Sequence, residues 1–233
     1  MPDAVTASRY AAAVPSGVPG RGRFILELLL ALLLTRLPYL GVPFKWLESF
    51  FHELSHGLAT LLSGGIVSHI QLFPNGAGFC FSQGGAPLLI GFAGYFGAAC
   101  WGYLIFILAT WPRGIRASFA FLGGAVLLSL LLWGRDLLTI GILLTLACLL
   151  LLPLRLKHQP ALLSGLRVAA LMIMLNALAS PAVLFGLSGQ GDAVILAQNS
   201  WLPAWFWVLS WLSCSAGFLY LAWRRVDRAS LLR

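Results

Sequence analysis

Three chemically reactive side chains stand close together in the chain, where residues 52–56 read His-Glu-Leu-Ser-His. In a helix, His52 and His56 lie on one face one turn apart, so both imidazoles can bind the same metal ion. Glu53 adjoins His52 and is suitably placed to take a proton from a metal-activated water. Zn²⁺ with three protein ligands and an open position lowers the pKa of that water to about 7. The pattern predicts zinc-dependent hydrolysis of an amide bond, with His52 and His56 as ligands and Glu53 as general base.

Few side chains can supply the third zinc ligand, because the chain has only seven acidic residues and four histidines. Four acidic residues have positions that make them less suitable as the third ligand. They are Asp3 in the N-terminal arm, Asp227 in the basic tail, Glu27 near the start of an apolar run, and Glu48, one turn before His52. Asp192, Asp136 and His69 remain. We favour Asp192, because the flexible stretch Gly189-Gln190-Gly191 lets the backbone approach a metal closely. Asp136 is typical of an exposed turn and His69 falls in a predicted hairpin, but both stay open as alternatives.

The composition predicts an integral membrane protein. Hydrophobic residues make up 60% of the chain, charged residues 9%, and the mean hydropathy is +0.90. Soluble domains carry about 25% charged residues, and a soluble fold of this size cannot bury so much apolar surface. Charged groups in a transmembrane helix cost about 2.5–3.5 kcal/mol each on insertion scales, which argues that the His-Glu-His cluster has a function. The alternative is a polar helix face that hydrogen-bonds to neighbouring helices.

The net charge of +8 sets membrane topology rather than indicating a nucleic-acid partner. The basic residues occupy short stretches between apolar runs, around 113–116, around 155–158 and in the C-terminal tail. The positive-inside rule makes the side that collects these loops cytoplasmic. Arg21 and Arg23 argue for the opposite side, so the orientation stays open. The four cysteines are far apart and form no C-x-x-C pair, which indicates neither a disulfide framework nor a thiolate metal site.

Hydrophobic runs and turn signals predict an all-α polytopic membrane protein with about six or seven transmembrane helices. We expect a disordered arm over 1–20, a single membrane domain over 21–224 and a basic tail over 225–233. The expected helices cover about 24–40, retained rather than cleaved as a signal peptide, then 43–63, 86–110, 117–133, 137–153, 161–187 and 203–223. Pro74-Asn75-Gly76 predicts a β-hairpin between residues 65 and 85. The string Gly91, Gly94, Gly97 suits close helix packing.

Several stretches together make the chain resemble the site-2 protease group of intramembrane zinc metallopeptidases, in its small bacterial branch. They are His52 to Ala59, Leu62 to Gly65, Pro74 to Gly78, Ala93 to Ala99, Gly191-Asp192-Ala193, Leu202-Pro203-Ala204 and a Trp-rich last helix. The resemblance implies Zn²⁺ bound by His52, His56 and a later aspartate, which supports Asp192, with Glu53 as base. Better-known members carry Asp-Gly, often after Asn-Pro, whereas Ala193 follows Asp192 here. Asn176, Gln198 and Asn199 are candidates for an amide that orients the substrate.

We therefore expect a multi-pass enzyme of the bacterial cell membrane that cleaves membrane-embedded or membrane-proximal peptides. An extended substrate suits pairing with the hairpin at 66–82. The competing hypothesis is a non-catalytic membrane scaffold or metal-binding protein that retains the fold. Glu53 favours the enzyme, since metal binding alone does not need it. A transporter is less well supported, because the sequence has no pair of broken helices.

Overall fold

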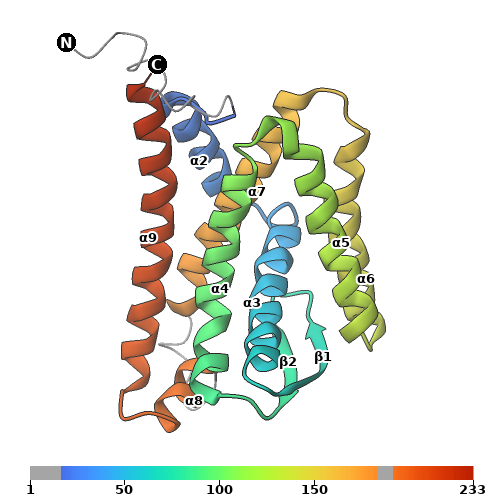
Figure 1. Ribbon diagram of the computed structural model, residues 1–233, viewed down its shortest axis with the longest axis vertical. Helices are drawn as coiled ribbons and strands as arrows, with labels where there is room; N and C mark the ends of the chain where they lie inside the picture. Colours follow the sequence, from blue (N-terminus) through green and yellow to red (C-terminus); the bar gives the residue numbers. More distant parts are fainter. Residues whose placement is uncertain (1–16, 183–190, 233) are drawn as a thin grey trace, which may run out of the picture.

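The computed structural model describes residues 17–182 and 191–232, and these are mostly helical (Figure 1). The helices are α2 (Arg21–Arg36), α3 (Val42–Leu62), α4 (Pro87–Leu108), α5 (Ile115–Trp133), α6 (Leu137–Leu151), α7 (Gln159–Ala179), α8 (Asp192–Gln198) and α9 (Ala204–Leu231). Short 3₁₀ turns, η1 (Pro112–Gly114) and η2 (Leu152–Arg155), precede α5 and follow α6. Strands β1 (Ile66–Leu72) and β2 (Gly78–Gln83) form one antiparallel hairpin after α3. The predicted all-α class and the predicted hairpin are confirmed.

Five helical segments of the described chain are long and apolar enough to cross a membrane. They are 87–108, 112–133, 137–155, 159–182 and 204–231. The expected number was six or seven, and the difference lies in the first two helices. At 1.5 Å per residue, the 16 residues of α2 extend about 24 Å, short of a hydrocarbon core of about 30 Å. Helix α3 is longer but carries Lys45, Glu48 and Glu53.

Helices α2 and α3 follow one another in the same direction along α7 instead of folding back as a pair (Figure 1). Glu27 of α2 accepts two hydrogen bonds from Arg167, near the start of α7. Glu48 of α3 accepts one from Ser180, just after the end of α7. The chain therefore runs along α7 as it passes from α2 to α3. The N-terminus of α2 lies at the end of the bundle where α7 begins.

The hairpin packs beside α3, with its turn at the sequence that predicted it. Gly76 adopts φ +88°, which favours glycine, and the Asn75 side chain accepts a hydrogen bond from the Ala77 N–H at 3.0 Å. β1 also contacts the segment between α5 and α6, since Ile70 bridges to Gly134. On the opposite side of the pair, β2 has no further strand partner within the described part of the chain.

Helix α7 forms the centre of the bundle. Its residues 169–174 are all buried, and α2, α3, α4 and α9 pack around it. Small residues allow the close approach of α4, since Gly102 lies against Met174 of α7. Many leucines of α2, α5 and α6 remain exposed, for example Leu131 at 76%, as expected of helices surrounded by lipid.

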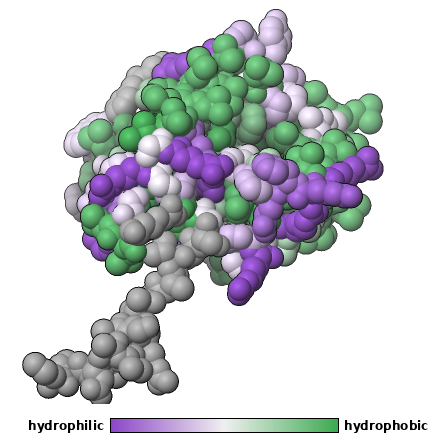
Figure 2. Space-filling model, turned by 90° about the horizontal axis from the view of Figure 1, so that it is seen from above, coloured by the Kyte–Doolittle hydropathy of each residue, from purple (hydrophilic) through white to green (hydrophobic). Residues whose placement is uncertain are grey.

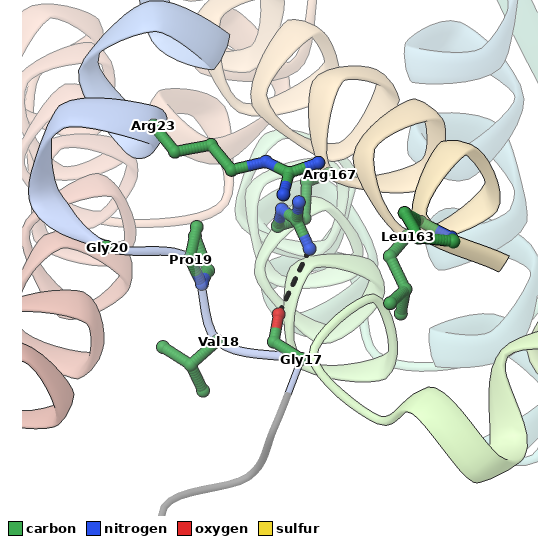
Figure 3. Close-up of a pocket in the computed structure, with 8 residues that line it drawn as sticks. Gly17, Val18, Pro19, Gly20, Arg23, Leu163 and Arg167 are labelled. Carbon is green, nitrogen blue, oxygen red and sulfur yellow. Dashed lines mark hydrogen bonds between the residues drawn. The ribbon is translucent and has the colours of Figure 1, made fainter. Parts of the chain in front are cut away.

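The first described residues, 17–20, pack against the bundle. Val18 is buried, and Arg167 donates a hydrogen bond to the Gly17 carbonyl at 3.0 Å (Figure 3). A cavity of about 280 Å³ lies between residues 17–20 and α7. The remainder of the arm expected over 1–20 lies outside the described residues. At the other terminus, α9 continues without a break through the expected start of the tail, as far as Leu231.

Candidate metal centre

The His-Glu-x-x-His segment lies in the C-terminal half of α3, as its sequence pattern predicted. Pro43 in the first turn favours the start of the helix, and Gly64, at φ +84°, follows its last residue and Ser63. Leu47, Phe50 and Phe51 are buried in the bundle core. Glu53 and His56 are buried as well, at 5% and 7% exposure. Glu53 and His56 therefore face other parts of the protein rather than lipid.

The two imidazoles and the Asp192 carboxylate form a compact triangle of possible ligand atoms. The Nε2 atoms of His52 and His56 are 3.0 Å apart, and Asp192 Oδ2 lies 3.1 and 3.3 Å from them. In a tetrahedral zinc site with bonds of about 2.0–2.1 Å, ligand atoms are separated by about 3.3–3.4 Å. Two imidazoles and one carboxylate are also donors that zinc commonly binds. The donor set and its spacing therefore fit zinc.

Neighbouring groups orient both imidazoles. His56 Nδ1 lies 2.6 Å from the carbonyl oxygen of Ile90 in α4, so Nδ1 carries the proton and Nε2 presents its lone pair toward Asp192. The ring of His52 packs edge-to-face on Tyr95 of α4, with centroids 4.4 Å apart. Both rings are thus held by α4, and their Nε2 atoms lie 3.0 Å apart.

Glu53 lies beside this triangle, and its side chain contacts the hairpin. Its carboxylate oxygen is within 4.8 Å of the ligand nitrogens of both histidines. It lies directly against Gly78 of β2, where a β-carbon would be 2.7 Å from Glu53 Cγ. The preceding acidic residue, Glu48, points elsewhere, because its Oε2 accepts from the Ser180 hydroxyl at 3.4 Å. Of the two carboxylates on α3, Glu53 is therefore the one placed to act on a water beside the histidines.

Helix α8 brings Asp192 to the histidines. It begins at Asp192, directly after Gly191 at φ +97°, whereas Gly189 and Gln190 of the predicted flexible stretch lie outside the described residues. Leu196 of α8 is fully buried and packs on Gly91 of α4, where a β-carbon would lie 3.0 Å from it. Trp211 of α9 belongs to the same buried cluster as Leu196. Asp192 thus depends on a seven-residue helix wedged between α4 and α9.

The other candidates for a third ligand have different surroundings. Asp136 caps the N-terminus of α6, where its Oδ1 accepts from the Thr139 N–H at 2.9 Å. Although desolvation opposes this, hydrogen bonds from Thr139 lower the pKa of Asp136. His69 stacks on Phe81 across the hairpin, with centroids 4.2 Å apart. Neither side chain is joined to the His52–His56 pair.

The three amide side chains that are candidates for orienting the substrate also have different surroundings. Asn199 donates to the Ile195 carbonyl at the end of its own helix, and Gln198 is exposed. Asn176 of α7 is 8% exposed, and its Nδ2 has no hydrogen-bond partner within the described residues. Cys80 lies near Glu53, but burial first and the nearby carboxylate second raise the pKa of its thiol to about 12.

Sequence reasoning missed the contribution of α4 and β2. A β-carbon at Gly94 would lie 2.6 Å from His52 Nε2, and one at Gly78 would lie 2.8 Å from Glu53 Oε1. The glycine string of α4 was interpreted only as helix packing, which does hold for Gly91. The glycine string belongs to the helix that follows the one with the histidines, and this was the available signal for a contact between them. Spacing alone does not show which glycine faces the histidines.

The fold and this site define a polytopic, mostly helical membrane protein with a candidate metallopeptidase centre. Residues 25–222 match the family described as Peptidase M50B-like, and the chain belongs to this family. The match is consistent with the resemblance to the site-2 protease group, and it makes the protein a member of a family of membrane metallopeptidases. Comparison with curated proteins and with solved structures found no match.

Proposed function

We propose that this protein is a zinc-dependent endopeptidase of the bacterial cell membrane that hydrolyses membrane-embedded or membrane-proximal peptides. The observation that carries the proposal is the convergence of His52, His56 and Asp192 within 3.3 Å, with Glu53 beside them. The first three side chains would hold zinc. When bound, zinc lowers the pKa of its water and polarises a carbonyl group. The family match supports peptide-bond hydrolysis as the reaction.

Glu53 has the role of general base in this mechanism. Its carboxylate takes a proton from the attacking water and delivers it to the leaving amide nitrogen. Burial at 5% exposure limits competing contacts with bulk water, and Gly78 of β2 packs directly against the Glu53 side chain. His56 keeps its orientation through the Ile90 carbonyl, so the base and the ligands are fixed by different elements.

The hairpin offers a place for an extended substrate. β1 is paired on one side with β2 and bridged on the other to Gly134, so β2 carries the free edge. The close approach of Gly78 in β2 to Glu53, where a β-carbon would be 2.7 Å from Glu53 Cγ, supports a position of this strand next to the base. A substrate strand added about 4.8 Å from β2 would therefore pass close to Glu53.

The test is zinc analysis and proteolysis by the purified protein in proteoliposomes that contain single-pass reporter substrates. Wild type should bind one zinc per chain and cleave a reporter. Removal of zinc with a chelator should abolish cleavage, and added zinc should restore it. Glu53→Gln should keep zinc but lose at least about 100-fold in rate, the scale of general-base catalysis. Glu48→Gln is the matched control, because it makes the same change one turn away in the same helix.

Three outcomes contradict this proposal. Wild type that binds no zinc removes the proposed metal centre. Wild type that binds zinc but cleaves none of the reporters favours the non-catalytic scaffold instead. Glu53→Gln that cleaves as well as wild type removes Glu53 as the general base.

A further inference from the structure

The cavity beside residues 17–20 lies at the end of the bundle where α7 begins. Hydrophilic side chains gather on this end of the molecule, next to apolar ones (Figure 2). Arg167 of α7 lines the cavity, whereas Ser180, which donates to Glu48 on the helix of the histidines, lies about 20 Å further along, at 1.5 Å per residue. The cavity is therefore separate from the candidate metal centre, and the proposed proteolysis does not use it.

Two guanidinium groups border this cavity and share their partners (Figure 3). Arg167 is 2% exposed, and its Nη2 donates to Glu27 Oε1 at 2.7 Å and to Ser164 Oγ at 3.1 Å. Arg23, at an exposed position, donates from Nε to the same carboxylate oxygen at 3.3 Å and from Nη2 to the same hydroxyl at 2.6 Å. Two positive side chains thus lie against one carboxylate, which leaves one positive charge uncompensated.

A third guanidinium group, that of Arg225 in α9, reaches the same segment of the chain. Its Nη2 donates to Thr110 Oγ1 at 3.1 Å, and a β-carbon at Gly17 would lie 2.6 Å from the Thr110 carbonyl oxygen. The Nε atom of Arg225 is buried and has no acceptor within the described residues. Glu27 is the single carboxylate of the described chain that pairs with any of the three guanidinium groups, so this region carries an excess of positive charge.

The N-terminus of α2 adds to this positive potential. The helix begins after Gly20 without a side-chain cap, and its first turn has no acidic residue but contains Arg21 and Arg23. The N–H groups of a first helical turn have no partner within the helix, and the aligned peptide dipoles place positive partial charge there. Cations are unfavourable at this position, and only Arg21 has a carboxylate of its own, that of Asp227. An anion bound at this end would compensate the remaining charge.

Hydrogen-bond donors for an anion are available at the cavity. Arg23 Nη1 donates to no group within the described residues. The Ser164 hydroxyl accepts from both guanidinium groups and donates to nothing in the described part of the chain, so its hydrogen can be donated to a ligand. Other walls of the cavity are apolar and include Val18, Pro19 and Leu163. The cavity therefore combines free donors and positive charge with apolar walls.

We propose that this cavity binds a phosphate group, carried by the headgroup of an anionic phospholipid or present as free phosphate. Guanidinium groups bind phosphate oxygens through charge-assisted hydrogen bonds, and a helix N-terminus favours the same anion. Arg23, Ser164 and the first turn of α2 supply the donors. Arg167 keeps its hydrogen bonds to Glu27 and Gly17, so it contributes charge and fixes the wall of the cavity. This inference goes beyond the proposed function and depends on neither zinc nor proteolysis.

Thermal unfolding of the purified protein in detergent tests the site. Phosphatidylglycerol and inorganic phosphate are titrated separately, with phosphatidylcholine and with sodium chloride of equal ionic strength as the respective controls. At tenfold its Kd, a bound ligand should raise the Tm of wild type by about 3–6 °C above the control. A shift with phosphatidylglycerol alone identifies a lipid headgroup as the source of the phosphate group, and a shift with inorganic phosphate identifies the free anion. No shift with either ligand overturns the proposal.

Three variants locate the shift, which is measured for each variant against its own Tm without ligand. Arg23→Gln removes one guanidinium group, and Leu163→Trp fills the cavity without a change of charge, so each should lose most of the shift. Arg228→Gln is the matched control and should keep the shift, because Arg228 is exposed, follows the Arg21 partner Asp227 and does not line the cavity. An unchanged shift in Arg23→Gln or in Leu163→Trp, or an equal loss in Arg228→Gln, contradicts binding in the cavity.

Discussion

Gly94 of α4 faces His52 of α3 so closely that a β-carbon at position 94 would lie 2.6 Å from the His52 Nε2 atom, and also against His56. The position is helical, and in a helix alanine is normally more favourable than glycine by about 1 kcal/mol. Any loss caused by Gly94→Ala therefore comes from the added methyl group and not from the backbone. The absence of a side chain at this position leaves the space in which a metal would meet both imidazoles.

Gly94→Ala should therefore lose bound zinc and proteolysis while the protein remains folded. Zinc is measured per mole of purified protein, and folding by thermal unfolding. Gly165→Ala in α7 is the matched control, because a β-carbon there meets nothing within 4 Å, and it should retain zinc. Full zinc occupancy in Gly94→Ala would show that the ion binds elsewhere.

Gly78→Ala should lower activity without removing zinc. The new methyl group would lie 2.7 Å from Glu53 Cγ and 2.8 Å from both Glu53 Oε1 and Ser49 Oγ, so the carboxylate or β2 must move. The nearest atoms belong to Glu53 and Ser49 and not to the histidines, so zinc content should stay at the wild-type level. The kcat should fall about 10-fold or more, a part of the roughly 100- to 10,000-fold that general-base catalysis contributes. Gly57→Ala, whose β-carbon would make ordinary contacts of 3.5–4.0 Å, should leave kcat nearly unchanged. Equal kcat values for the two variants would contradict the proposed role of Glu53.

Asp192→Ala and Asp136→Ala should separate a metal ligand from a helix cap. Asp192→Ala removes a carboxylate 3.1 Å from His52 Nε2 and should greatly reduce zinc affinity. Asp136→Ala removes the N-cap of α6 and should cost about 1 kcal/mol of stability while zinc affinity is kept. Competition with a chromophoric chelator measures the affinity. Loss of zinc in Asp136→Ala alone would refute our choice of third ligand.

The ion pair between Arg167 and Glu27 should contribute to stability and not to the metal centre. The two side chains are 2% and 8% exposed and are joined by two hydrogen bonds of 2.7 Å. Removing one partner leaves a buried, uncompensated charge, so Arg167→Met should cost about 3–5 kcal/mol. Thermal unfolding measures the loss, and Glu27→Leu combined with Arg167→Met should recover much of it. Arg23→Gln, at an exposed position beside the same carboxylate, should have a small effect; a large one would contradict the role of burial.

The sequence by itself determined the features that depend on local spacing and composition. The His52–His56 separation matches one helical turn, Pro74-Asn75-Gly76 specifies a turn, and 60% hydrophobic residues require a lipid surrounding. These properties hold whatever the rest of the chain does. The helical class, the hairpin and the peptidase family were accordingly predictable, as was a short list for the third ligand.

Only the tertiary structure decided how distant segments meet. Asp192 reaches the histidines because Leu196 fits against Gly91 of α4 and packs in one buried cluster with Trp211 of α9, so three helices meet there. The same packing brings Gly94 onto the imidazoles. The direction of α2 along α7 places Arg21 with the other basic loops, where counting of apolar runs had placed it on the opposite side. Such contacts depend on the shape of whole helix surfaces, which one-dimensional spacing does not record. The role of Asp192 as a zinc ligand stays a prediction, now with a defined geometry behind it.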